Sequence, residues 1–318
     1  MSLTTTRTYL STDADAPVVN GQAGSFIALT KACLIGVDGV AYGSKPAVGG
    51  WSIVFEDPST HRLVLRNSMA HGGLGCCVLI TNASNAVVMQ CGSDWDAVNE
   101  TLLNAVVGRS FNVSNITDSS AREWGVFADE RTFYCATKPY PGNLDQAGIR
   151  GAGDYESFWA GDVCAYFVMV GWDGAWSTAI RVSAGMSNIS NQSSGVLVGG
   201  RNSTFGVLGA AFFACFGFAQ PGGEIAGGWS NSSSFGPTNP PNGVIFTSPA
   251  YVRVGANNEV SGKMRLLHVC DHIRNTGGLI ELLPGMATSA GVPLAQIRTN
   301  TNGNGNLYTP LFVEVEVE

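Results

Sequence analysis

Charged residues are scarce in this sequence. Asp, Glu, Lys and Arg make up only 13% of the 318 residues, about half the share that is usual for a soluble domain. The 17 Lys and Arg residues are scattered singly, and the net charge is -7. Without a basic stripe the chain offers no continuous surface to phosphate groups, so we expect no nucleic-acid partner. A surface this poor in charge suits packing against other subunits, and it equally suits a compact β monomer.

Long apolar runs are also missing. The most apolar stretch is VLGAAFFACFGFA at 207–219, whereas a helix that spans a bilayer needs roughly 20 apolar residues. We therefore expect no membrane span, and we expect this stretch to form buried β structure. The first residues, MSLTTTRTYLSTDADAP, lack the apolar core of a secretory signal, which predicts synthesis in the cytoplasm of the producing cell.

Signatures of catalysis and of cofactor binding are absent from the sequence. It contains no GxSxG and no GxxxxGK[ST], and its four histidines leave few ways to build a catalytic triad. The glycine pairs lack the strand-to-helix setting of a phosphate-binding loop. We therefore predict that the protein is not an enzyme and carries no cofactor.

One short segment has the spacing of a metal site. In LHVCDHI, the side chains of His268, Cys270 and His272 would share one face of a strand, because alternate side chains of a strand point the same way. A zinc site usually takes ligands from more than one element, however, and no fourth donor is evident. We interpret the segment as a polar strand face with one buried thiol, and we predict no bound metal.

The eight cysteines form no CxxC pair, which excludes a zinc ribbon and a thioredoxin-like site. Their neighbours are mostly apolar, as in GCCVLI and FFACFG, so we expect buried thiols in core strands rather than disulfides. The adjacent Cys76 and Cys77 would point to opposite faces of one strand and would not bridge each other.

Short apolar runs bounded by turn residues are abundant in the chain. Gly alone accounts for 41 residues, and Asn, Ser, Asp and Pro also flank the runs. This pattern predicts a mainly β fold of many short antiparallel strands, in a sandwich-like or barrel-like arrangement. The expected strands lie at 50–57, 62–67, 76–82, 86–91, 123–128, 131–137, 163–172, 195–200, 243–248, 251–255 and 263–270.

Two segments have helical periodicity. Residues 23–34, AGSFIALTKACL, place their apolar side chains on one face, and Ser25 could cap the helix. In residues 94–107 the apolar face would consist of Trp95, Val98, Leu102 and Val106. We therefore predict one or two short helices in an otherwise β chain.

Changes in composition divide the chain into three regions. Residues 1–35 are expected to form an N-terminal arm and a short helix, and residues 36–140 a β domain. Residues 141–318 are expected to form a second β region with long polar loops at 183–195 and 227–243, and the two β regions could form one composite domain. At the C-terminus, LYTPLFVEVEVE alternates valine with glutamate, which predicts an edge strand.

The segment AREWGVFADERTFYCAT, residues 121–137, brings Asp129, Glu130 and Arg131 together. Apolar residues alternate on both sides of these charges, which predicts a β-hairpin with the charges at a solvated tip. The two carboxyl groups of a catalytic pair would face each other across a cleft, whereas Asp129 and Glu130 are neighbours in one turn. We interpret the segment as structural.

Three tryptophans lie in Gly-rich and Asn-rich surroundings that are typical of exposed loops. Trp172 and Trp176 occur in GWDGAW, and Trp229 occurs in GGWSNSSSF. Exposed aromatic rings of this kind stack on sugars or insert into a partner protein. These residues are candidate binding aromatics, either for a host-surface glycan or receptor or for a neighbouring subunit.

Landmark segments follow one another along nearly the whole chain. They are APVVNGQAGSFIALTKACL, GW at 50–51, AREWGVFADERTFYCAT, SFWAGDVCAYF, NGVIFTSPAYV and LLPGM. In this order they resemble a family of poorly characterised virion structural proteins of tailed bacteriophages, usually encoded among tail genes. Residues 92–120 and the 227–243 loop carry no such landmark. The resemblance implies a component of the virion and assigns no catalytic residue.

Composition and resemblance together predict a non-enzymatic virion subunit that is made in the host cytoplasm. It would belong to the tail tip, the baseplate or an attached spike or fibre, and would assemble as a symmetric oligomer with other virion proteins as partners. A receptor-binding or carbohydrate-binding module and a capsid decoration protein are the alternatives. A glycan-degrading tail enzyme would need a carboxylate cleft that the sequence does not indicate.

At least two of three extended, weakly charged segments are expected to contact another chain. The three segments are residues 1–20, 227–243 and 307–318. Ordering a chain costs about 1–2 kcal/mol per residue, and we expect these segments to be ordered only by packing against a neighbouring subunit. The predicted intersubunit contacts are Tyr9, Leu10, Trp229, Phe235 and Phe312.

Overall fold

The computed structural model describes residues 6–106, 108–139, 148–158, 165–170, 195–199, 207–214, 247–254, 259–270, 279–288, 291–297 and 311–316. Within these ranges the chain is mainly β, with one α-helix, α1 (Ser25–Leu34), and one short 3-10 helix, η1 (Met69–His71). The predicted fold class is therefore confirmed. No helix in the same ranges is long and apolar enough to cross a membrane.

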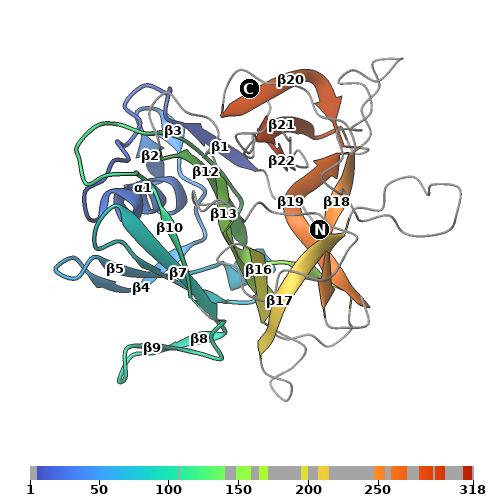
Figure 1. The fold of residues 1–318 in the computed structure, drawn as a ribbon, viewed down its shortest axis with the longest axis horizontal. Helices are drawn as coiled ribbons and strands as arrows, with labels where there is room; N and C mark the ends of the chain where they lie inside the picture. Colours follow the sequence, from blue (N-terminus) through green and yellow to red (C-terminus); the bar gives the residue numbers. More distant parts are fainter. Residues whose placement is uncertain are drawn as a thin grey trace, which may run out of the picture.

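Thirteen of the described strands form one antiparallel sheet (Figure 1). Its path begins at β1 and ends at β20 without rejoining, so the described strands do not form a closed barrel. The short β14 (Glu156–Ser157) lies off this path and pairs with β19. The strand order is β1 (Arg7–Leu10), β11 (Glu123–Ala128), β12 (Thr132–Lys138), β13 (Gly148–Asp154), β15 (Tyr166–Val170), β16 (Gly195–Gly199), β17 (Val207–Ala214), β18 (Thr247–Val254), β19 (Glu259–Cys270), β22 (Leu311–Glu314), β21 (Pro293–Ile297) and β20 (Ile280–Ala287).

A second antiparallel sheet has five strands, all from the first part of the chain. Two small hairpins accompany it, β2 (Val40–Tyr42) with β3 (Lys45–Pro46), and β8 (Asp94–Asp96) with β9 (Thr101–Leu103). The order of the five strands is β10 (Arg109–Asn112), β7 (Ala86–Gly92), β6 (Cys77–Thr81), β5 (Arg62–Arg66) and β4 (Ser52–Asp57).

Strands β11, β12, β13 and β15 are buried on both faces, which makes the fold sandwich-like. In β11, Trp124 and Val126 pack into a core shared with α1 and the five-stranded sheet, whereas Phe127 packs into a second core with β19 and β22. In β12, Phe133 and Tyr134 divide between the two cores in the same way. Figure 1 shows β12 and β13 lying between the α1 side and the β19–β22 side. The middle layer therefore exposes neither face to water.

Strand β13, with the sequence GIRGAGD, is one that the sequence did not predict. Its glycines look like a turn, but all seven residues are buried. A Cβ added to Gly151 would lie 2.5 Å from Cδ1 of Tyr134 on the neighbouring strand β12. The missing side chain therefore makes room for an aromatic ring in the second core.

Helix α1 confirms the predicted helix at 23–34, but Ser25 does not cap it. The Ser25 hydroxyl donates instead to the Asn20 carbonyl, at 3.0 Å. The cap comes from a distant residue, because the Asn82 side-chain oxygen accepts the Phe26 N–H at 2.9 Å and the Asn82 carbonyl accepts the Gly24 N–H at 2.9 Å. A buried asparagine 56 positions away thus begins the helix.

The predicted helix at 94–107 is wrong, because this segment contains the β8–β9 hairpin. The Asp96 carboxylate accepts the backbone N–H groups of Val98 and Asn99 and thereby fixes a turn. Glu100 has a positive φ of 50°, which a helix does not allow. Val98, expected on the apolar face of a helix, is 90% exposed at the hairpin tip.

The N-terminal arm and the C-terminal strand both pack on their own chain. Residues of β1 pair with β11, and β22 lies between β19 and β21, so the predicted edge strand is an interior one. Tyr9 is buried in the core shared with α1, and Phe312 is also buried, with 1% and 0% exposure. The expectation that these two side chains depend on a neighbouring subunit for burial is therefore corrected.

The large sheet also crosses the predicted domain boundary at residue 140, since β12 pairs with β13 along six residues of each strand. The two ends of the described chain meet as well. Arg7 forms an ion pair with Glu316, and the Glu316 N–H donates to the Thr8 hydroxyl at 3.2 Å. The β regions before and after residue 140 thus share one continuous sheet.

Candidate functional site

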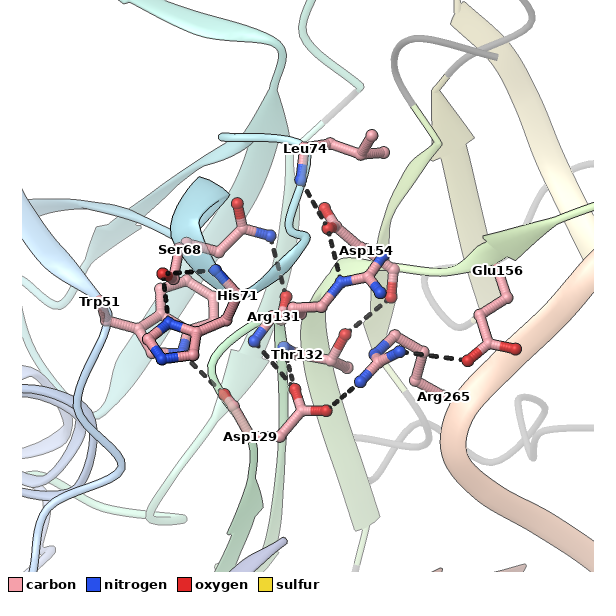
Figure 2. A network of polar contacts seen from close by, with 11 residues as sticks. Trp51, Ser68, His71, Leu74, Asp129, Arg131, Thr132, Asp154, Glu156 and Arg265 are labelled. Atoms are coloured by element: carbon pink, nitrogen blue, oxygen red, sulfur yellow. Dashed lines mark hydrogen bonds and ion pairs between the residues drawn. The ribbon is translucent and has the colours of Figure 1, made fainter. Parts of the chain in front are cut away.

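The turn between β11 and β12 is the centre of a buried polar network (Figure 2). Asp129 is fully buried, and its Oδ1 accepts the backbone N–H groups of Arg131 and Thr132, each at 2.8 Å. Its Oδ2 forms an ion pair with the Arg265 guanidinium on β19. The prediction that the charges of this turn lie at a solvated tip is therefore wrong for Asp129. The hairpin itself is confirmed.

A second buried carboxylate, Asp154 at the end of β13, lies in the same network. Its Oδ2 accepts the Leu74 N–H at 2.8 Å and lies 3.4 Å from Nε of Arg131. The Asp154 carbonyl accepts the Thr132 hydroxyl at 2.7 Å. Burial raises the pKa of Asp154, although hydrogen bonds and Arg131 partly oppose this. This group joins the turn to β13 and to the loop before β6.

The arginine on β19 holds two parts of the large sheet together. Besides Asp129, Arg265 pairs with Glu156 of β14 at 3.1 Å. Burial would lower the pKa of Arg265, but the neighbouring Asp129 and Glu156 raise it, so the guanidinium stays charged. Figure 2 shows Arg265 between these two carboxylates. Each buried charge here has an opposite charge beside it, as buried ions require.

A tryptophan beside the network supports the turn, and a serine–histidine pair beside it caps η1. Trp51 donates its indole N–H to the Asp129 carbonyl at 2.8 Å. The Ser68 hydroxyl lies 2.7 Å from Nδ1 of His71 and accepts the His71 backbone N–H, which makes it the cap of η1. Asp129 and Asp154 are both 0% exposed, so neither carboxylate reaches solvent. These contacts hold the turn against β13 and β19.

A groove on the surface runs between helix α1 and strand β4, and we call it the α1–β4 groove. It has a volume of about 840 Å³. Its lining is largely apolar, and the Lys31–Glu56 ion pair connects α1 to β4 at 2.6 Å. Two apolar side chains on it are exposed, Val37 by 77% and Ile53 by 41%. Other lining residues include Ala28, Ala32, Ile35, Ala41, Asp57 and Arg62.

The groove is a site that sequence reasoning missed. The outer face of α1 contributes small side chains at Ala28 and Ala32, which a sequence does not distinguish from ordinary solvated helix positions. The exposed Val37 and Val40 flank a tight turn at Asp38 and Gly39, both with positive φ. These residues form one surface because the turn at Asp38 lies beside α1 and β4 in the folded chain.

The predicted site residues lie in different places. Leu10 is partly buried on β1 and pairs with Gly125. The candidate aromatics Trp172, Trp176 and Trp229 lie outside the described residues, and so does Phe235. For the four residues outside the described ranges, the binding and intersubunit assignments therefore stay predictions.

The cysteine prediction is confirmed for the described thiols, whereas the prediction for the 268–272 segment stays a prediction. Cys33, Cys76, Cys77, Cys91 and Cys135 are buried and free, which confirms the prediction for these five thiols. Cys76 and Cys77 pack on opposite faces of their sheet. His268 bonds through Nε2 to Glu314 at 2.9 Å, whereas the Cys270 side chain and His272 are not among the described parts.

Burial raises the pKa of Cys91 and Cys135, and Cys135 reaches about 12 although Arg150 partly opposes the shift. Thiols with a raised pKa are poor nucleophiles at neutral pH.

A scan against models of known protein families and a search of curated proteins found no match to this chain.

Proposed function

We propose that the chain is a non-enzymatic structural subunit of a tailed-bacteriophage particle, in the tail tip, the baseplate or an attached spike or fibre. The α1–β4 groove is the observation that carries this proposal. Exposed apolar side chains gathered in one groove, here Val37 and Ile53, are often found at protein–protein contacts. The landmark segments add the resemblance to virion proteins, and the sparse charge is compatible with close packing among subunits.

The buried network supports a mechanical role. Asp129 pairs with Arg265, and Asp154 pairs with Arg131. Both carboxylates also accept backbone N–H groups, so the network connects β12, β13 and β19. A subunit that transmits load through a particle benefits from such cross-links between distant strands. Neither buried carboxylate faces a cleft that could admit a sugar, which a retaining or inverting glycosidase requires.

The test is the presence of the chain in purified particles of the phage that encodes it. We expect quantitative mass spectrometry to find a fixed copy number per particle, and electron microscopy to show its density repeated with the symmetry of the tail. We expect deletion of its gene to give incomplete particles that a plasmid copy restores.

Two outcomes contradict the proposal. A chain that occurs only in the infected-cell lysate and never in particles overturns the virion assignment. A deletion that leaves complete particles but abolishes adsorption to host cells favours the receptor-binding or carbohydrate-binding alternative.

A further inference from the structure

Strand β4 is an open edge of the five-stranded sheet. Among the described residues it pairs with β5 alone, whereas β10, at the other edge, contributes Phe111 to the core shared with the large sheet. An open edge presents unpaired backbone N–H and C=O groups and is a template for pairing with another chain. β4 contains neither lysine nor proline, and its protective charges, Glu56 and Asp57, lie at its C-terminal end, which leaves Ile53 uncharged at the edge.

Strand β4 has an irregular register, and two of its side chains lie in the groove. The ladder with β5 shifts between Ile53 and Phe55, as at a β-bulge. Ile53 and Glu56 line the groove beside α1, while Phe55 packs on the outer face of the sheet against Trp95. The edge and the apolar groove therefore face the same side and form one surface.

The charges of the groove favour a second copy of the chain over an acidic or a basic partner. Two positive groups, Lys31 and Arg62, and two negative groups, Glu56 and Asp57, lie along it. In a contact with two-fold symmetry each copy presents the same patch, so such a patch must be complementary to itself. A patch with both signs is compatible with this requirement, whereas a single-sign patch would repel its own copy.

We propose that the α1–β4 groove is the contact between two copies of this chain related by a two-fold axis. This proposal deepens the proposed function, since it names the surface by which the subunit assembles. In the dimer Ile53 and Val37 are covered, and Lys31 exchanges its own Glu56 for Glu56 of the partner subunit. The number of ion pairs stays the same while apolar surface is removed from water.

The first test uses the apolar side chains. Ile53→Asp in the full-length protein places a charge at the centre of the contact, and we expect the dissociation constant of the dimer to rise at least about tenfold in sedimentation or light scattering. Val98→Asp is the matched control, because Val98 is exposed on the β8–β9 hairpin and does not line the groove. Circular dichroism verifies that both variants fold.

The second test separates contacts between copies from contacts within one chain. Lys31→Glu and Glu56→Lys each leave a groove with like charges at these two positions, so each variant alone is expected to be monomeric. When the two variants are mixed, the negative groove meets the positive one. We expect native mass spectrometry to find the heterodimer, which dissociates as salt is added. An ion pair that acts only within one chain cannot produce this complementation.

The outcomes also distinguish this proposal from the virion assignment. A wild-type protein that stays monomeric across a dilution series, or an Ile53→Asp variant that dimerises normally, overturns the groove proposal even if the chain is found in particles. A chain absent from particles whose mixed charge variants form the heterodimer keeps the groove proposal and overturns the virion assignment. Binding of a different virion protein in the groove of a monomeric wild type also overturns the second-copy proposal.

Discussion

Asp129 and Arg265 form a buried ion pair across 136 positions of sequence. Asp129 lies in the turn between β11 and β12, and Arg265 lies on β19. The pair therefore links the early and late strands of the chain by charge. Its energetic contribution can be measured separately from that of the surrounding hydrogen bonds.

Replacing one partner of this pair is expected to be costly. Asp129→Asn keeps an oxygen for the N–H groups of Arg131 and Thr132 but removes the charge beside Arg265. We expect the free energy of unfolding to fall by about 2–3 kcal/mol, because the buried Arg265 loses one of its two counter-charges and keeps only Glu156. Denaturant unfolding measures this change.

Two further variants serve as controls for the ion pair. The double variant Asp129→Asn/Arg265→Met is expected to lose clearly less than the sum of its two single changes. Lys138→Met, at the partly exposed pair with Glu123, should cost at most about 1 kcal/mol. Strict additivity of the two changes at Asp129 and Arg265 would contradict the ion-pair interpretation.

The N-terminus of α1 provides a second prediction. Asn82→Ala removes the acceptor of the Phe26 N–H and leaves that buried donor without its cap, so we expect a loss of about 1–2 kcal/mol. Ser25→Ala is the matched control at the position that looks like a cap in the sequence, and it is expected to change stability by less than about 0.5 kcal/mol. Equal losses for the two variants would show that Asn82 does not act as the cap.

A third prediction concerns the close approach at Gly151. Gly151→Ala forces a methyl group against the Tyr134 ring, and overpacking of this kind typically costs about 1–3 kcal/mol. Tyr134→Leu removes the ring, so Gly151→Ala should cost less in the Tyr134→Leu variant than in the wild type. Thermal unfolding of the three variants measures this coupling, and additive effects would contradict the proposed steric contact.

The fourth prediction is a pH dependence at Asp13. Burial would raise the pKa of this carboxyl, but hydrogen bonds from Lys45, the Leu10 N–H and Tyr42 hold it below its usual value. A depressed pKa in the folded state contributes stability above the unfolded pKa of about 3.9. That contribution is lost as the pH falls through the lower, folded pKa.

Asp13→Asn tests this pH dependence. We expect the variant to be less stable at neutral pH and to approach the wild type below the folded pKa, because Asn cannot gain a charge. Urea unfolding at a series of pH values makes the comparison. A stability difference that stays constant from neutral to strongly acidic pH would refute the role assigned to the Asp13 charge.

The elements that the sequence predicted correctly are those with a strong local pattern. Strands such as 123–128 and the helix at 23–34 carry their apolar residues in a clear order, bounded by turn residues. Residues 94–107 show the limit of this reasoning. Their helical spacing is real, but the local bonds of Asp96 and the contact of Trp95 with Phe55 favour a hairpin.

The buried polar network around Asp129 and Arg265 could not be predicted from the local sequence pattern. In a hairpin turn, adjacent charges are most often solvated, and nothing near Asp129 in sequence indicates that Arg265 lies beside it. Strand β13 was missed for a similar reason, because the fit of Gly151 against Tyr134 depends on the pairing of β13 with β12. The groove depends on the meeting of α1, β4 and the turn at Asp38, which a one-dimensional pattern does not contain.

The position of β1 has a consequence for synthesis on the ribosome. Among the described strands β1 pairs with β11 alone, which is made much later, and the Ser11 hydroxyl accepts the Trp124 N–H across 113 positions. At about 5–20 residues per second, this partner emerges on the order of ten seconds later. During that interval β1 lacks the strand with which it pairs. We therefore expect nascent chains stopped before residue 123 to leave the N-terminal strand open to chaperones and proteases, and chains stopped well beyond residue 138 to protect it.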